Sequence, residues 1–305
     1  MKKRIEWIDI AKGLAIILMV VGHTAIPSRI NNWIYSFHMP FFFFISGVLT
    51  KPQTSSKPIQ ISSYLTHKVK VLIYPFLVYS TINILLYPLY GKLPLSEYFK
   101  QIIVCGWGGI ALWFVPVFFF SVIISYLLNT SKKNATISSI FLAAMGTLLC
   151  YYDIRLTWNL STIPIACMYI LLGSILQEKV YEITKIKYIY KVLILTTLLI
   201  VGFTLSQYGR LDLASNNILP FAPIFIASLC GITVLIIAST LIKRTFFKNV
   251  LTFIGKHTFE IMAFSQVTIL IINNNFTHNS IIKYLIMVIV IYITCKAKDK
   301  LTSNI

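Results

Sequence analysis

The first membrane-length apolar stretch of the sequence, Trp7 to Ile26, holds three ionisable side chains: Asp9, Lys12 and His23. Each such group costs roughly 2.5 kcal/mol or more at the centre of a bilayer. A helix that only anchors a protein in lipid needs none of them. We therefore expect these side chains to take part in chemistry or binding.

The spacing of Lys12 and His23 places them on one face of a helix. They are eleven residues apart, which is three turns plus about 20°, so they lie ~16 Å apart along the axis. Asp9 precedes Lys12 by three residues, a spacing at which an ion pair would lower the cost of both charges. The stretch thus predicts one polar face with a lysine at one end and an imidazole at the other.

A second histidine follows in the next apolar stretch, IYSFHMPFFFFISGV. If the two stretches are antiparallel neighbours, His38 comes to a depth similar to that of His23. Imidazole is the side chain best suited to accept a proton from a hydroxyl near neutral pH. Ser46 and Gly47 lie ~12 Å further along the second helix and let backbone or a ligand approach closely.

Simpler interpretations of the same residues remain open. A membrane histidine often only bridges two helices by a hydrogen bond, and a lysine can extend its ammonium to the interface without further role. The run from Phe41 to Phe44 is interpreted as lipid-facing and packing in preference to a ligand cage. The combination favours chemistry, because buried charge is spread along one helix face.

Composition indicates an integral membrane protein. The chain is 57% hydrophobic and 12% charged, about half the charged fraction of a soluble domain. Its net charge of +18 resides in short clusters between apolar runs, a pattern typical of cytoplasmic loops and not of a nucleic-acid groove. The five cysteines show no metal-ligand spacing, so we predict neither a metal site nor a nucleic-acid partner.

The apolar runs predict an all-α integral membrane protein with ten transmembrane helices. With the N-terminus inside, most lysines and arginines fall on the inner side, so both termini are predicted to be cytoplasmic. The whole chain, residues 1–305, is expected to form one domain in the lipid bilayer. The predicted spans are 7–26, 32–50, 70–90, 110–129, 136–152, 160–177, 188–206, 218–242, 250–272 and 280–296.

DIAKGLAIILMVVGH followed by FHMPFFFFISGVL resembles the start of the membrane acyltransferase 3 family, whose first helix carries a basic residue, ten intervening residues and a histidine. HKVKVLIYPF, LWFVPVFF and IGKHTFEI resemble later family segments in the same order, and YGRLDL resembles a loop of the fucose acetylase-like and capsular polysaccharide O-acetyltransferase branch. Two positions depart from the pattern. Lys68 and Lys70 stand where arginine is frequent, and AFSQ, with Ser265 and Gln266, stands where relatives often carry a histidine.

The resemblance implies an enzyme, a multi-pass O-acyltransferase of the bacterial cell membrane. It implies transfer of an acetyl group from cytoplasmic acetyl-CoA, a co-substrate and not a permanently bound cofactor, to a hydroxyl of a cell-surface or exported glycan. Glycan-assembly proteins are further candidate partners. On this basis the catalytic candidates are His23 and His38, with Asp9 in support, and the acyl-CoA-binding candidates are Lys12, Ser46, Lys68 and Lys70. Direct attack by the acceptor and a two-step route through an acetylated histidine or serine both remain open.

Acceptor recognition is expected on the outer face. The candidates are Trp113, Asp153, Trp158, Arg210 and Asp212. The tryptophans also suit an interfacial aromatic belt, and Arg210 and Asp212 also suit a mutual surface ion pair.

Transport is the competing hypothesis. A helix bundle with internal histidine, lysine and aspartate could export a polysaccharide or lipid-linked glycan coupled to protons. Such a protein should show inverted repeats and broken helices in both halves, and neither is clear in the sequence. Consumption of acetyl-CoA by the purified protein would separate the two hypotheses.

Overall fold

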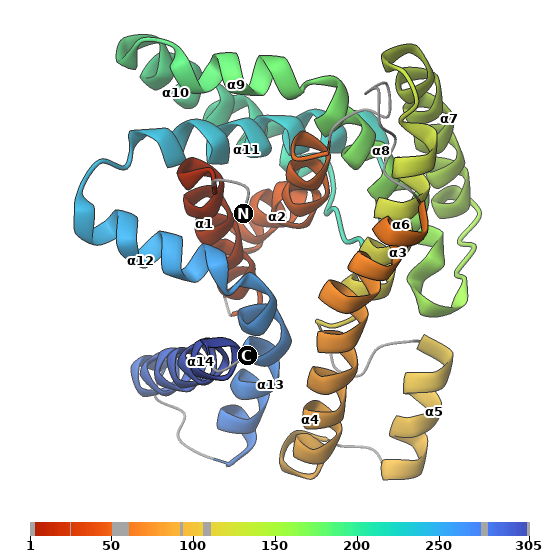
Figure 1. The fold of residues 1–305 in the computed structure, drawn as a ribbon, viewed down its shortest axis with the longest axis vertical. Helices are drawn as coiled ribbons and strands as arrows, with labels where there is room; N and C mark the ends of the chain where they lie inside the picture. Colours follow the sequence, from red (N-terminus) through yellow and green to blue (C-terminus); the bar gives the residue numbers. More distant parts are fainter. Residues whose placement is uncertain are drawn as a thin grey trace.

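The computed structural model describes residues 4–24, 26–50, 61–91, 94–105, 111–275 and 280–303. Within these ranges the chain is helical, and its only β-type pairing is an isolated bridge between Asp212 and Asn217. Figure 1 shows the helices. Their bounds are α1 Glu6–Gly22, α2 Ser28–Val48, α3 Ile61–Lys68, α4 Tyr74–Tyr90, α5 Leu95–Cys105, α6 Phe114–Leu128, α7 Lys132–Tyr151, α8 Ile163–Ile175, α9 Gln177–Lys185, α10 Tyr188–Leu205, α11 Phe221–Leu241, α12 Thr245–Lys256, α13 Thr258–Asn275 and α14 Ser280–Ser303.

Five helical stretches of the described chain are long and apolar enough to cross a membrane. They are Ile61–Tyr90, Lys132–Tyr151, Thr157–Ile175, Tyr188–Tyr208 and Phe221–Leu241. Each overlaps a predicted span, although Ile61–Tyr90 begins nine residues before the predicted 70–90. The remaining predicted spans also fall on helices, but these are shorter or carry charged and polar side chains, and the count of ten stays a prediction.

The predicted span 250–272 is wrong as a single helix. α12 ends at Lys256 and α13 begins at Thr258, with His257 outside helical geometry (φ −109°, ψ 24°). α12 packs on α1 along one side, while Phe246 and Phe247 are exposed. Glu260 then falls in the first turn of α13, where the helix dipole favours an acidic side chain.

Glycines let α1 and α2 approach their neighbours at backbone distance. A Cβ at Gly13 would overlap the carbonyl oxygen of Leu251 in α12, and one at Gly255 would overlap that of Asp9 in α1. Gly47 in α2 and Gly173 in α8 are related in the same way. Small residues at such crossings give close helix packing in membranes, and here they fix the two helices that carry the polar side chains.

Candidate active site

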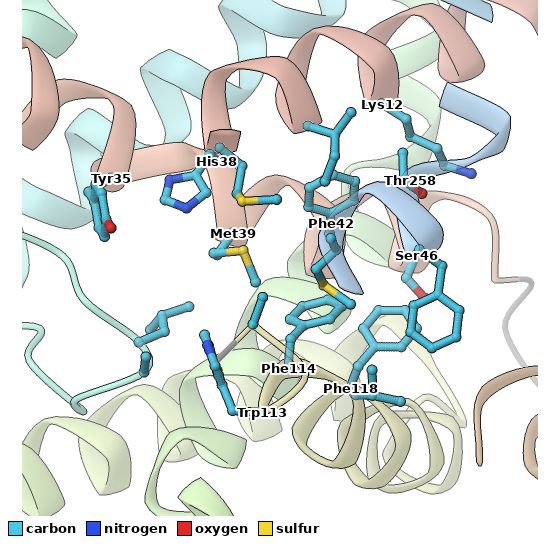
Figure 2. Close-up of a pocket in the computed structure, with 18 of the residues that line it drawn as sticks. Lys12, Tyr35, His38, Met39, Phe42, Ser46, Trp113, Phe114, Phe118 and Thr258 are labelled. Carbon is cyan, nitrogen blue, oxygen red and sulfur yellow. The ribbon is translucent and has the colours of Figure 1, made fainter. Parts of the chain in front are cut away.

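A cavity of about 390 Å³ lies between α1, α2, α6, α13 and the segment 211–214 (Figure 2). Side chains that the sequence places far apart meet in its wall. Those predicted as site residues are Lys12, His23, His38, Ser46, Trp113 and Asp212. Lys12, Thr258 and Ser46 lie toward one end of the view in Figure 2, and Tyr35 and His38 toward the other.

One face of α1 forms a wall along the length of this cavity. Lys12, Ile16, Met19 and His23 all line it. Their spacing is that of a single helix face, so the predicted shared face of Lys12 and His23 is what the structure has. The cavity therefore extends at least ~16 Å along α1, from an ammonium to an imidazole.

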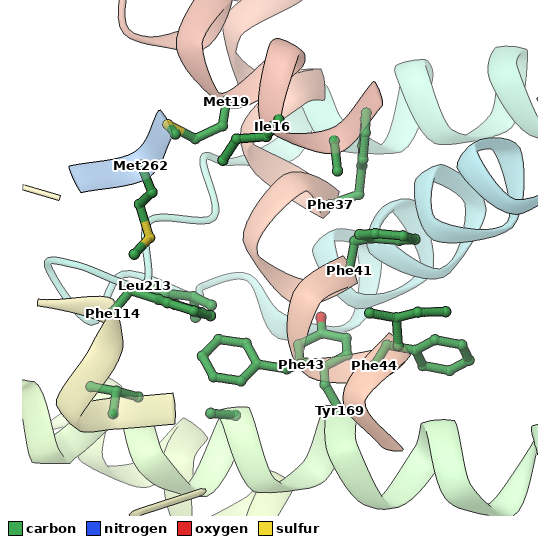
Figure 3. Packing of buried hydrophobic residues seen from close by; sticks show 14 of the residues in the cluster. Ile16, Met19, Phe37, Phe41, Phe43, Phe44, Phe114, Tyr169, Leu213 and Met262 are labelled. Atoms are coloured by element: carbon green, nitrogen blue, oxygen red, sulfur yellow. The ribbon is translucent and has the colours of Figure 1, made fainter. Parts of the chain in front are cut away.

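Most of the phenylalanine run of α2 is packed among buried apolar side chains, as Figure 3 shows for Phe41, Phe43 and Phe44. Phe41, Phe43 and Phe44 are at most 3% exposed, and Phe42 lines the cavity. The prediction that the run faces lipid is wrong, while its packing role is confirmed. The reason is that α2 has neighbours on several sides, since it contacts α1, α8 and α11.

His38 has a defined tautomer in this structure. Its Nδ1 lies 2.9 Å from the backbone oxygen of Ile34. A carbonyl oxygen only accepts hydrogen bonds, so Nδ1 carries the hydrogen and donates it. In the neutral ring Nε2 then keeps its lone pair, which makes His38 a hydrogen-bond acceptor toward any ligand on that side.

Tyr35 connects the two imidazoles. Its hydroxyl is 3.1 Å from Nδ1 of His23. Its ring packs edge-on against both histidines, with centroid distances of 5.8 Å to His23 and 4.9 Å to His38. When Nδ1 of His23 donates to this hydroxyl, Nε2 of His23 is free to accept a proton. Sequence reasoning missed Tyr35, although its position three residues before His38 puts both on one helix face.

Asp212 lines the cavity, and Arg210, which does not, contacts Tyr35 at the imidazole end. The Arg210 guanidinium lies 3.8 Å from the centroid of the Tyr35 ring, a cation–π contact. Its Nη2 is 4.0 Å from Oδ2 of Asp212, the outer limit of an ion pair. Since Asp212 also lines the cavity, the alternative interpretation of these two residues as only a surface ion pair is incomplete.

The loop that carries them is folded into the wall. Asp212 and Asn217 exchange backbone hydrogen bonds of 2.8 Å. The hydroxyl of Thr162 donates to the oxygen of Leu213 at 2.8 Å, and Leu211 and Leu213 are each 3% exposed. This apolar anchoring positions the polar residues of the loop.

The Lys12 end differs from the sequence prediction in its ion pairing. Asp9 is 4% exposed and pairs with Arg4, with 3.2 Å between Oδ2 and Nε. The predicted Asp9–Lys12 pair is not formed, because Lys12 faces the cavity and Asp9 does not line it. Among the described residues Lys12 has no hydrogen-bond or ion-pair partner, so its ammonium is available to a ligand.

Lys68 and Lys70 lie outside the cavity wall. Lys68 Nζ is 5.2 Å from the centroid of the Tyr64 ring, and Lys70 is exposed. A π-helical turn, Val69–Ile73, follows Lys68, and its Leu72 does line the cavity. Both lysines thus lie within about one turn of the wall, and π-helical turns are frequent at functional sites.

Two predicted acceptor residues are not at the cavity. Asp153 pairs with Arg155 at 2.9 Å, and both are exposed. Trp158 is 39% exposed and donates from Nε1 to the oxygen of Ile103. Its neighbour Asn159 lines the cavity instead. Both Trp158 and Asn159 have positive φ angles, 60° and 55°. Because of this turn, Trp158 contacts Ile103 while Asn159 lines the cavity.

These features describe a helical membrane protein with a cavity inside its bundle that is lined by both apolar and polar side chains. The sequence profile of the acyltransferase 3 family, described as an acyltransferase domain, matches residues 5–296. The chain belongs to this family, so it is a membrane acyltransferase. No curated protein and no solved structure matches it.

Proposed function

We propose that this protein is an O-acetyltransferase, which moves an acetyl group from cytoplasmic acetyl-CoA to a hydroxyl of a cell-surface or exported glycan. It would do so in the bacterial cell membrane, with ten spans and both termini in the cytoplasm. The observation that carries the proposal is one continuous cavity with the Lys12 ammonium at one end and two imidazoles at the other.

The donor fits the Lys12 end. In the proposed orientation this end faces the cytoplasm, where acetyl-CoA is made and where basic side chains attract its phosphates. Beyond Lys12 the wall is mostly apolar, with Ile16, Met19 and Met262. Such a passage suits the long pantetheine arm, which would bring the thioester toward the imidazoles.

The imidazole end supplies the base. The acceptor hydroxyl gives its proton to Nε2 of His23 as its oxygen attacks the thioester carbonyl. The new C–O bond forms, the C–S bond breaks, and the proton passes to the leaving thiolate. His38 accepts a hydrogen bond through Nε2 from a neighbouring hydroxyl of the acceptor and thereby orients the sugar. Its tautomer leaves the neutral ring no second N–H with which to polarise the carbonyl or protonate the thiolate.

We favour direct attack over a seryl intermediate. An activated serine needs a base within hydrogen-bond reach. Ser46, the serine in the cavity wall, is eight residues beyond His38 on the same helix, ~12 Å away along the axis. It is better placed to contact the donor near Lys12. Arg210, Asp212 and Trp113 at the imidazole end are the groups proposed to contact the glycan.

Thiol release from acetyl-CoA by the purified full-length protein, with and without surface glycan of the host cell, tests the function. We expect release that glycan accelerates, together with acetylated glycan by mass spectrometry. A protein that neither binds acetyl-CoA nor releases thiol would refute the proposal. No observation on the described residues favours the transport hypothesis.

A further inference from the structure

Gln266 is a polar residue of the cavity wall that has no role in the reaction proposed above. Gln266 lines the cavity and is only 7% exposed. Its Oε1 is buried and has no hydrogen-bond partner among the described residues. Leaving a buried acceptor unpaired costs roughly 1–3 kcal/mol, so a side chain in this state at a cavity wall indicates a ligand that supplies the missing donor.

The position of Gln266 limits which part of a ligand it meets. The cavity-lining residues of α13 are Thr258, Phe259, Met262 and Gln266, in that order along the helix. Thr258 lies toward the Lys12 end (Figure 2). Gln266 is eight residues further, ~12 Å along the axis, and so lies toward the imidazoles and beyond the apolar Met262.

We propose that Gln266 recognises the acyl donor by accepting a hydrogen bond from the amide N–H nearer the sulfur of its pantetheine arm. This rests on the proposed acetyl-CoA donor. That amide is two carbons from the sulfur, so it lies close to the imidazoles when the thioester reaches them. The arm alternates apolar carbons with amides, and along α13 the apolar Phe259 and Met262 precede the amide of Gln266. Glutamine has no titratable group, so its part is binding and not proton transfer.

The test compares CoA with an analogue in which this amide nitrogen is replaced by an ester oxygen. Dissociation constants are measured by calorimetry on full-length protein in lipid nanodiscs, so no glycan is needed. We expect the wild type to bind CoA about tenfold more tightly than the analogue. The ester has no N–H to donate, and its oxygen would face Oε1 of Gln266, which is also a hydrogen-bond acceptor. The wild-type comparison requires no variant.

Gln266→Met keeps the side-chain length and removes the acceptor. It should bind CoA and the analogue equally, at the affinity of the wild type for the analogue. Gln266→Asn, which is one methylene shorter, should also lose the preference for CoA over the analogue. It replaces Gln266→Met in the test if the methionine variant does not fold. Ser265→Ala is the matched control, since Ser265 is also buried but does not line the cavity. It should keep the wild-type preference.

The outcomes separate this inference from the function on which it rests. Equal affinities in the wild type, or a preference that survives in Gln266→Met, would overturn the role of Gln266 while acetyl-CoA remains the donor. A wild type that binds neither compound would refute the donor itself, and the inference with it.

Discussion

At the scale of single residues, Tyr35 explains how the two imidazoles are held. Its ring contacts both of them and its hydroxyl bonds His23. Arg210 covers the same ring from the loop side. One tyrosine thereby links the proposed base, the second imidazole and the segment proposed to contact the glycan.

Tyr35→Phe should lower kcat and leave KM for acetyl-CoA unchanged. The ring and its packing stay, but His23 loses the partner of Nδ1 that fixes its orientation. Losing a partner that orients a functional histidine reduces activity about 10- to 100-fold in metal sites, and we expect the lower part of that range. Steady-state thiol release in the presence of glycan measures both constants. An unchanged kcat would show that the hydroxyl does not orient His23.

Lys12→Ala should weaken CoA binding, and Lys12→Arg should retain part of it. The charge survives in arginine, although its planar group differs in geometry from an ammonium. Calorimetry on protein in detergent gives both affinities. If Lys12→Ala binds CoA as tightly as the wild type, Lys12 serves packing or topology only.

At the scale of the helices, the position of α1 depends on its crossing with α12. Gly13 and Gly255 bring the two backbones into contact there. The crossing lies beside Asp9 and Lys12, so it also sets the depth at which Lys12 enters the cavity.

Gly255→Ala should destabilise the protein and weaken CoA binding together. Its Cβ would overlap the backbone oxygen of Asp9, which cannot move without shifting α1. Overpacking of this kind costs about 1–3 kcal/mol. Gly146→Ala is the control, because its Cβ would meet mainly the flexible side chain of Ile165. Thermal unfolding in detergent measures both, and equal stabilities would contradict the close crossing.

Hydrophobic pattern predicted most of the helices but not their interruptions. It located the five long apolar stretches because membrane spans need sustained apolar length. It missed the break at His257, because apolar residues of α12 and α13 continue on both sides of it and no proline or glycine pair marks the end of α12. It also missed the burial of Phe41, Phe43 and Phe44, because lipid-facing and core-facing phenylalanines look alike in one sequence.

At the scale of the whole molecule, the site joins residues from both halves of the chain. Spacing within a helix predicted the shared face of Lys12 and His23. Between helices the sequence gives approximate depth, but not the direction in which a side chain points. Asp153 and Trp158 were therefore grouped with Asp212, although the structure keeps them outside the cavity.

Arg210→Ala should stop transfer to glycan, or raise the glycan concentration it needs, and leave slow hydrolysis of acetyl-CoA without glycan intact. Arg210 lies at the imidazole end, away from the Lys12 end where CoA phosphates are proposed to bind. Arg155→Ala is the matched control, because Arg155 is an exposed arginine whose ion pair is outside the cavity. Thiol release with and without glycan distinguishes them. Loss of glycan-independent hydrolysis would show that the loop shapes the entire site.

The most direct test of the proposed mechanism is glycan acetylation by His23→Ala, measured by mass spectrometry of the cell-surface glycan at matched expression of variant and wild type. CoA binding to the purified variant shows that it is folded and that the Lys12 end is intact. We predict retained CoA binding and no acetylated glycan, because the imidazole that accepts the hydroxyl proton is gone. Acetylation at the wild-type level would contradict this mechanism.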